Sequence, residues 1–121
     1  MTDSLLEKAR PHSQWLARQL DHQRLDLARL NDWLPRPLTP EDFAAFADWQ
    51  RILSDEDEAE LARQLRLLRR HVMAHIMTRD LCRVSDLGEV TRTITELADF
   101  AANTALFFSH QYYEGMYGTP V

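Results

Sequence analysis

The sequence predicts an all-α fold, a bundle of about five helices dominated by a long antiparallel helical hairpin. The 121 residues include only 3 Gly and 5 Pro. Apolar residues recur every three or four positions along most of the chain, and no stretch alternates as a strand does. A chain of this length has room for one domain. We therefore expect a single helical domain over 1–121, with short covering helices in 1–53 and the long hairpin in 54–121.

The covering region begins with short helical segments and then stops at a proline-rich turn. Pro35 and Pro37 cannot continue a helix, because proline lacks an N–H and restricts the residue before it. Thr39 followed by Pro40 predicts a new helix start, with Thr39 as the cap. The residues expected to share one face of that helix are Phe43, Phe46, Ala47 and Gln50.

The first long helix is expected over 55–80. Ser54 followed by Asp57 three residues later predicts its start as a weak capping box. Acidic residues fill the first turns, where they interact favourably with the positive end of the helix dipole. The apolar stripe of this helix, at spacings of 4, 3, 4 and 4, consists of Leu61, Leu65, Leu68, Val72 and Ile76.

The second long helix is expected over 86–115, with Ser85 and Asp86 as its cap and with Gly115 and Gly118 at its end. At 1.5 Å per residue such a helix is roughly 40 Å long. Since only a few residues join the two long helices, they must lie antiparallel. The apolar face predicted for the second helix consists of Leu87, Val90, Ile94, Leu97, Ala101, Ala105, Phe108 and Tyr112.

Composition argues against several classes of function. The net charge of -5 argues against a general nucleic-acid binder, which needs a basic surface. No run approaches the roughly 20 apolar residues of a membrane helix, and the first residues lack the layout of a signal peptide. The single cysteine, Cys82, excludes an intramolecular disulfide and favours a reducing compartment. We expect a cytoplasmic protein that contacts neither nucleic acid nor membrane.

Two histidines have the spacing of metal ligands. His71 and His75 stand four apart, as two ligands on one helix face do, and Asp80 is a conceivable third ligand. In the zinc signature His-Glu-x-x-His a glutamate follows the first histidine, but this chain has Val72 there. We expect two structural histidines on the flank of a bundle helix, and a small metal- or ligand-binding bundle is the alternative.

The segment Asp55-Glu56-Asp57 matches the Asp-x-Asp pattern with which nucleotidyltransferases hold Mg²⁺. That chemistry needs carboxylates fixed at the end of a strand, after a Gly-Ser turn that binds phosphate. The chain contains no Gly-Ser dipeptide, and these acids open a helix, so helix capping is their expected role. We expect no catalytic, cofactor-binding or metal-binding residue in this chain.

The arginines of the first long helix fall into two groups, one on its polar face and one on its apolar stripe. Arg63, Arg66, Arg69 and Arg70 form either a solvated helix face, with pairs such as Glu60–Arg63, or a surface for an acidic partner or phosphate. Arg79 continues the apolar stripe, so its charge needs a carboxylate partner or a contact with a neighbouring domain. We prefer an ion pair that ties the hairpin together. The candidate partners are Asp80, Asp86, Glu89 and Asp99.

Two further apolar sets lie outside the main stripes. On the second long helix they are Phe100, Phe107, Tyr113 and Met116, and on the first they are Leu67, Met73, Met77 and Leu81. They are either buried against the N-terminal helices or exposed for a partner, since large exposed apolar patches usually mark interfaces.

The order of these segments resembles the helical N-terminal region of bifunctional glutamine-synthetase adenylyltransferase and adenylyl-removing enzymes. The resemblance is best over 54–120. It departs from the family at His75, where an arginine is common, and at Thr78, where a tryptophan is usual. The segments that carry the resemblance are Leu65-Arg66-Leu67-Leu68-Arg69-Arg70, Met73, Ile76, Arg79-Asp80-Leu81, Ser85-Asp86-Leu87, Glu89-Val90-Thr91, Thr95-Glu96-Leu97-Ala98-Asp99 and Tyr117-Gly118-Thr119-Pro120.

The resemblance implies a parent enzyme of nitrogen regulation with two nucleotidyltransferase halves. One half removes AMP from a tyrosine of glutamine synthetase by phosphorolysis, the other attaches AMP from ATP, and the regulatory protein PII and glutamine set the balance. Mg²⁺ and ATP or ADP are implied for the parent only, because the family's Gly-Ser and Asp-x-Asp follow the Gly-x-Pro that resembles Gly118-Thr119-Pro120.

The chain is therefore expected to be truncated before a nucleotidyltransferase domain, which it would support and cover. No catalytic residue is carried over from the family to this chain. The alternative is a complete, free-standing helical interaction module that binds an acidic or apolar partner through the arginines or the Met-rich face.

Overall fold

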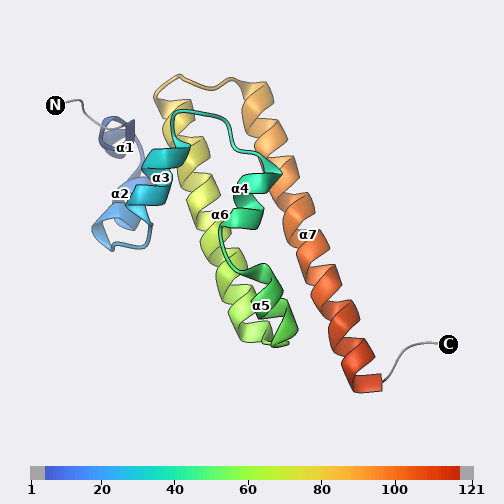
Figure 1. The fold of residues 1–121 in the computed structure, drawn as a ribbon. Helices are drawn as coiled ribbons and strands as arrows, with labels where there is room; N and C mark the ends of the chain where they lie inside the picture. Colours follow the sequence, from blue (N-terminus) through green and yellow to red (C-terminus); the bar gives the residue numbers. More distant parts are fainter. Residues whose placement is uncertain (1–4, 118–121) are drawn as a thin grey trace.

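The computed structural model describes the backbone of residues 5–117 and the side chains of residues 5–112 and 114. Over this range the chain is all-α, as predicted, and contains no strand (Figure 1). It holds seven α-helices and one 3₁₀ turn there, where the sequence predicts about five helices. In chain order the elements are α1 Leu5–Ala9, the 3₁₀ turn Arg10–His12, α2 Gln14–Asp21, α3 Leu27–Trp33, α4 Pro40–Ala45, α5 Trp49–Ser54, α6 Glu58–Leu81 and α7 Leu87–Tyr117.

The two long helices form the frame on which the short helices pack. Figure 1 shows α6 and α7 side by side and running in opposite directions, joined by a short loop at one end. Helices α1 to α3 lie along the C-terminal half of α6, on the side away from α7. Helix α4 contacts α7 and α5 contacts α6. Helices α1 to α3 therefore pack on one side of α6, and α4 and α5 pack against the two long helices.

The start of α6 differs from the prediction by a few residues. Ser54 does not cap this helix, because it is the last residue of α5. Glu56 has a left-handed φ of 51°, which turns the chain between the two helices. Asp57 is the cap, and its carboxylate accepts a hydrogen bond of 3.1 Å from the Glu60 N–H. The capping role expected for the acidic segment is therefore confirmed, with Asp57 as the residue responsible.

The helix predicted after Pro40 is divided into two. Its start is confirmed, since the Thr39 N–H donates to the Asp42 carboxylate at 2.8 Å. The helix then breaks after α4, and Asp48 caps α5 by accepting from the Arg51 N–H at 3.1 Å. The shared face predicted through Gln50 is therefore wrong: the break resets the helical phase, and Gln50 is exposed.

The start of α7 is confirmed and its end is not. The Asp86 carboxylate accepts from the Glu89 N–H at 2.8 Å, as a cap does. The helix does not stop at Gly115 but continues to Tyr117, because a single glycine inside a helix costs only about 1 kcal/mol relative to alanine. Gly118, the other predicted end, lies outside the described residues.

The buried face of α7 agrees with the predicted one in part, since Leu97 and Phe108 are buried and Val90 and Tyr112 pack partly against the core. Thr93 is buried as well, whereas Leu87 is 80% exposed and Ile94 is 45% exposed. The reason is an aromatic cluster that includes Phe100, which the sequence places outside the main stripe. The ring of Phe100 lies edge-on to two rings of the covering helices, with centroid distances of 5.8 Å to Phe43 and 5.6 Å to Trp49. Large aromatic rings bury more area than Leu87 or Ile94 would, so they set the orientation of α7.

The apolar stripe of α6 agrees with the prediction. Leu61, Leu68, Val72 and Ile76 are buried, and Leu65 packs partly against the same core. A regular 3.6-residue period over a long helix leaves little ambiguity about which side faces inward.

The position of the α6 cap can be tested by two alanine substitutions. We expect Asp57→Ala to lower the free energy of unfolding by about 1 kcal/mol, because the Glu60 N–H loses its partner. Ser54→Ala is the matched control and should have a much smaller effect, since Ser54 is exposed and does not cap α6. Urea unfolding measures both. A larger loss for Ser54→Ala would contradict the assignment.

Candidate functional site

Three polar side chains of α6 hold the backbone of α3. His71, His75 and Arg79 are spaced four residues apart and lie on successive turns of α6. The N–H of Asp26, the residue before α3, donates to His71 Nε2 at 2.8 Å. At the other end of α3, His75 and Arg79 bind carbonyl oxygens of residues 33–36. We call these three residues the α6 ladder.

The hydrogen bonds of the ladder fix the tautomers of both histidines. His71 accepts at Nε2, so its proton is on Nδ1, which donates to the Leu67 carbonyl at 2.7 Å. His75 donates from Nε2 to two carbonyl oxygens, of Trp33 at 3.0 Å and of Arg36 at 2.9 Å. Its Nδ1 is buried without a hydrogen-bond partner. Burial lowers the pKa of His71 and that of His75, because an apolar surrounding disfavours the charged imidazolium.

This arrangement leaves the histidine pair poorly suited to a metal ion. Both nitrogens of His71 are engaged with backbone groups, and Nε2 of His75 is as well. Asp80, the conceivable third ligand, is exposed. Among the described residues no group of three or more His, Cys, Asp or Glu could hold a metal. The expectation that this chain has no metal, cofactor or catalytic residue stays a prediction.

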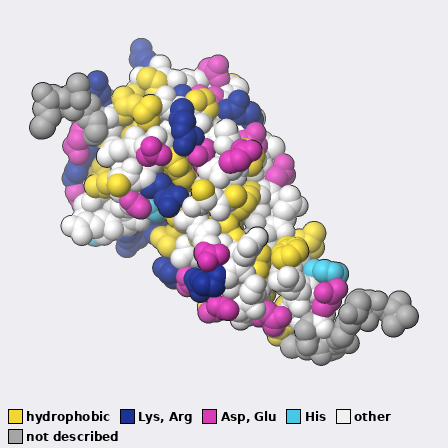
Figure 2. Space-filling view, viewed as in Figure 1, with side chains coloured by type: hydrophobic (Ala, Val, Ile, Leu, Met, Phe, Trp, Pro, Cys, Tyr) yellow, Lys and Arg dark blue, Asp and Glu magenta, His cyan; other side chains and the backbone are white. Residues whose placement is uncertain are grey.

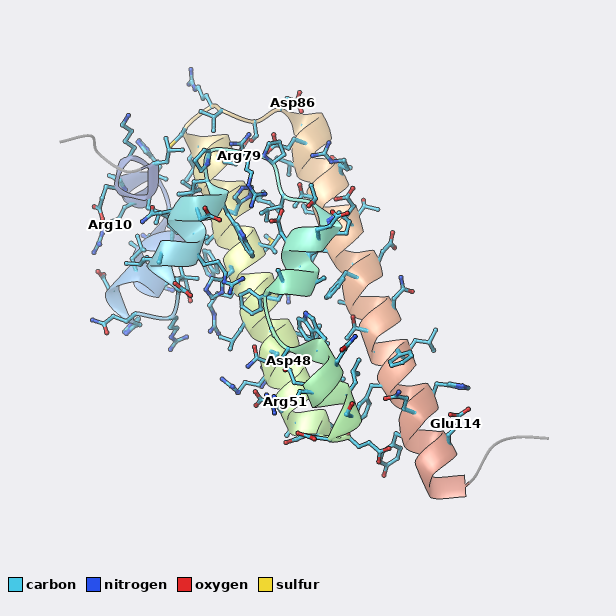
Figure 3. All side chains as sticks on the ribbon, in the orientation of Figure 1. Arg10, Asp48, Arg51, Arg79, Asp86 and Glu114 are labelled. Carbon is cyan, nitrogen blue, oxygen red and sulfur yellow. The ribbon has the colours of Figure 1, made fainter. Side chains whose placement is uncertain are left out.

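Arg79, the last residue of the α6 ladder, links the two long helices through an ion pair, as the sequence predicts. Its side chain is 7% exposed and forms an ion pair with Glu89 near the start of α7, with Nε–Oε2 at 2.8 Å and Nη2–Oε1 at 2.9 Å. Figure 3 shows Arg79 near the end of α6 from which the loop leads to α7. Its remaining bonds go to the carbonyls of Leu34 at 2.8 Å and Val84 at 3.1 Å. The hydrogen bonds from Arg79 hold the pKa of Glu89 below its ordinary value. Of the four candidate carboxylates, Glu89 is the partner.

The arginine run of α6 separates into a paired and an unpaired part. Arg63 forms two hydrogen bonds with Glu60, at 2.8 and 2.9 Å, as predicted. The guanidinium lowers the pKa of Glu60 to about 2. Arg66, Arg69 and Arg70 have no hydrogen-bond or ion-pair partner among the described residues. These three arginines line a groove instead.

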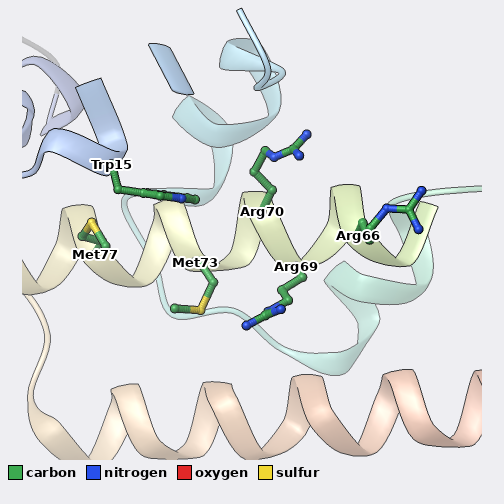
Figure 4. Close-up of a pocket in the computed structure, with 6 residues that line it drawn as sticks. All are labelled: Trp15, Arg66, Arg69, Arg70, Met73 and Met77. Carbon is green, nitrogen blue, oxygen red and sulfur yellow. The ribbon is translucent and has the colours of Figure 1, made fainter. Parts of the chain in front are cut away.

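The groove lies between α2 and α6, and its volume is about 420 Å³. Figure 4 shows the indole of Trp15 lying along α6 between Met77 and Arg70, with Arg66 further along the helix. The hydroxyl of Ser13, which caps α2, donates to the Met77 sulfur at 2.9 Å. The residues that line it are Trp15, Arg66, Arg69, Arg70, Met73 and Met77. We call this site the Arg–Met groove.

The apolar residues outside the main stripes of the two long helices are partly buried and partly exposed. Met73, Met77, Leu81 and Phe100 pack partly against the core, and Leu67 is half-buried. Phe107 is 50% exposed. Tyr113 and Met116 lie outside the side chains that the structure describes.

Sequence reasoning identified the arginines and methionines but missed two features. The α6 ladder was missed because its partners are backbone groups of α3, which no side-chain pattern reveals. The one available signal was the regular spacing of His71, His75 and Arg79. Trp15 was not assigned to the groove, because it comes from a distant helix.

Comparison with known proteins gives one consistent family. The family model described as glutamate-ammonia ligase adenylyltransferase matches residues 4–121. Two proteins named bifunctional glutamine synthetase adenylyltransferase/adenylyl-removing enzyme, from Neisseria meningitidis serogroups A and B, are each 56% identical over 121 residues. A protein of the same name from Nitrosomonas europaea is 38% identical over 119 residues. No solved structure matches the chain significantly.

The matches cover this chain almost entirely but only a small part of each relative. The two Neisseria matches span 100% of this chain and 14% of the relative, and the Nitrosomonas match spans 97% and 13%. The activity that each name describes is therefore that of a much longer protein.

Removing the Arg79 guanidinium should strongly destabilise the fold. We expect Arg79→Met to lower the free energy of unfolding by roughly 3–5 kcal/mol, because it leaves Glu89 and two carbonyls without their donor. Arg51→Met removes the exposed Arg51–Asp55 pair and is the control, with an expected loss below about 1 kcal/mol. Urea unfolding measures both, and equal losses would show that the Arg79 contacts are not special.

The two ladder histidines should make the fold sensitive to mild acid. Their pKa values are lowered in the folded state, so below about pH 6.5 the unfolded chain binds more protons. The free energy of unfolding should fall as pH drops from 7 to 5.5, by at most about 1.4 kcal/mol per pH unit for each imidazole.

Chemical denaturation at several pH values measures this slope. A His71→Gln/His75→Gln variant should flatten it, since glutamine does not titrate. His22→Gln is the control because His22 is exposed, and it should leave the slope unchanged. An unaltered slope in the double variant would refute the assignment.

Proposed function

Since the chain belongs to the glutamate-ammonia ligase adenylyltransferase family, we propose that it is a non-catalytic helical segment of a bifunctional adenylyltransferase and adenylyl-removing enzyme. Its role is to support and cover the nucleotidyltransferase domain that removes AMP from glutamine synthetase. Mg²⁺ and ATP or ADP bind the parent outside this chain. The parent acts in the cytoplasm in nitrogen regulation, with glutamine synthetase and PII as partners.

The observation that carries this proposal is the extent of the match. Two relatives align with the whole chain at 56% identity, while the chain spans only 14% of their length. The one Asp-x-Asp in the chain supports a non-catalytic role for this segment, because Asp57 caps α6 and Asp55 pairs with Arg51 at 3.4 Å. Both carboxylates therefore have structural roles, and the structure has no strand in residues 5–117 to present them to a metal.

An apolar surface near the end of α7 suits the contact with the next domain. Leu106 is 69% exposed and Phe107 is 50% exposed. Beside them, a groove of about 320 Å³ between α6 and α7 is lined mostly by apolar side chains, which include Leu65, Phe108 and Tyr112. Figure 2 shows hydrophobic side chains at the surface near the C-terminal end of the chain. Exposed apolar area of this kind usually marks an interface.

The free-standing interaction module is less well supported. In each of the two Neisseria relatives the matching segment is 14% of a much longer protein, which favours the first proposal. Among the described helices, none is long and apolar enough to cross a membrane.

The proposal can be tested in the full-length parent by placing charges on the α7 surface. We expect a Leu106→Glu/Phe107→Glu variant to lose most of its AMP-removing activity on adenylylated glutamine synthetase, because buried carboxylates would disrupt the contact with the catalytic domain. Adenylylation, which is assigned to the other half, should be much less affected. Release of AMP from glutamine synthetase is followed by mass spectrometry.

Asn103→Glu is the control, because Asn103 is an exposed polar residue on the same helix. It should leave both activities unchanged. Equal loss of both activities in the double variant would point to general unfolding rather than to a lost contact. A gene in which no Gly-Ser and Asp-x-Asp on a strand follow Val121 would contradict the proposal itself.

A further inference from the structure

We infer that the Arg–Met groove holds an acidic segment of the same parent polypeptide, taken from outside residues 1–121. Carboxylates of that segment pair with Arg66, Arg69 and Arg70, and one of its large apolar side chains rests on Trp15 and the two methionines. The inference rests on the proposed function, because the rest of the parent supplies the segment.

The first argument is charge. Helix α6 carries two arginines outside the groove, Arg63 and Arg79, and both are paired with glutamates. The three arginines in the groove have no partner among the described residues, and no carboxylate lines the groove. Within α6 no acidic residue stands between Glu60 and Asp80. In a chain with a net charge of -5, this is a local concentration of positive charge with nothing in the described structure to neutralise it.

Guanidinium groups bind anionic oxygens, and the carboxylates of Asp and Glu are the anionic groups that an unmodified polypeptide segment offers. The planar guanidinium of an arginine can bind a carboxylate through two parallel hydrogen bonds. Arg66 stands three positions from Arg69 and four from Arg70, so its charge is repelled by both of them along the helix. A segment with several Asp or Glu residues would remove this repulsion.

The second argument is the apolar floor. Trp15, Met73 and Met77 are half-buried, so each still presents apolar surface to the groove. Methionine adapts its shape to a partner, and an indole offers a flat face. The hydrogen bond from Ser13 to Met77 holds this floor in place before anything binds. The floor therefore suits a large aliphatic or aromatic side chain.

The shape favours a polypeptide over a small molecule. The groove follows α6 from Arg66 to Met77, which is roughly 16 Å at 1.5 Å per residue. One helix face and a single indole line it, whereas small-molecule sites usually bury most of the ligand surface. A short acidic segment laid along α6 would contact the arginines and the methionines together.

The third argument concerns the source of the segment. This chain spans 14% of the length of its Neisseria relatives, so most of the parent lies outside it. A segment on the same polypeptide reaches the groove at a high effective concentration, of order millimolar for short flexible linkers. A shallow groove with modest affinity is therefore enough when the segment is tethered.

The test uses the full-length parent and reads the exposure of the groove through its methionines. Peroxide oxidises exposed Met73 and Met77, and mass spectrometry measures the rate at each residue. We expect an Arg66→Glu/Arg69→Glu/Arg70→Glu variant to be oxidised severalfold faster than the wild type, because the segment is repelled. High salt should accelerate oxidation of the wild type in the same direction.

A control variant matches the change in net charge at other exposed arginines: Arg51→Glu/Arg83→Glu/Arg92→Glu. It should be oxidised at the wild-type rate. Circular dichroism and thermal unfolding confirm that both triple variants remain folded. A photo-crosslinker in place of Met73 identifies the occupant, and we expect a peptide rich in Asp and Glu from the same polypeptide.

Several results would overturn the inference. Equal oxidation rates in the wild type and the groove variant would mean that no acidic segment covers the methionines. A cross-link to a second copy of the protein, or protection that appears only with ATP or ADP, would assign the groove to a different occupant. These results are independent of the proposed function, which fails instead if α7 does not contact the catalytic domain or no such domain exists.

Discussion

The fold depends on how α6 holds the backbone of α3. Helix α3 has seven residues, which is far too short to be stable alone. The ends of any helix leave N–H and C=O groups without partners. His71 supplies the acceptor at the start of α3, and His75 and Arg79 supply donors to the carbonyls around its end. Three side chains on one long helix therefore bind backbone groups at both ends of the short one.

Arg79 joins this attachment to the closure of the hairpin. The same guanidinium that binds the Leu34 carbonyl also binds Val84 in the loop and Glu89 on α7. Burying a guanidinium is costly unless its hydrogen bonds are satisfied, and four bonds from one side chain meet that condition. The positions of α3, of the loop and of the start of α7 are consequently fixed together.

Sequence patterns predicted the parts of the fold that depend on one helix at a time. The 3.6-residue period identified the buried stripe of α6, and Thr39 and Asp86 marked true helix starts. The patterns failed where the orientation or the start of a helix depends on its contacts with other segments of the chain. The aromatic cluster around Phe100 set the orientation of α7, and the preceding helix extended over Ser54 and moved the cap to Asp57. For the groove, the arginines and methionines were visible in the sequence, but their combination with Trp15 depends on packing between helices.

The contacts of the α6 ladder involve the main chain of α3, and main-chain atoms are common to almost every amino acid. The exposed positions of α3 are therefore free to vary among natural homologues without loosening its attachment. Position 26 is different, because proline there would remove the N–H that donates a hydrogen bond to His71. Position 75 needs a donor that reaches the carbonyls of Trp33 and Arg36. Substitutions in this region are therefore limited by whether the new residue keeps these hydrogen bonds, and not by its identity as such.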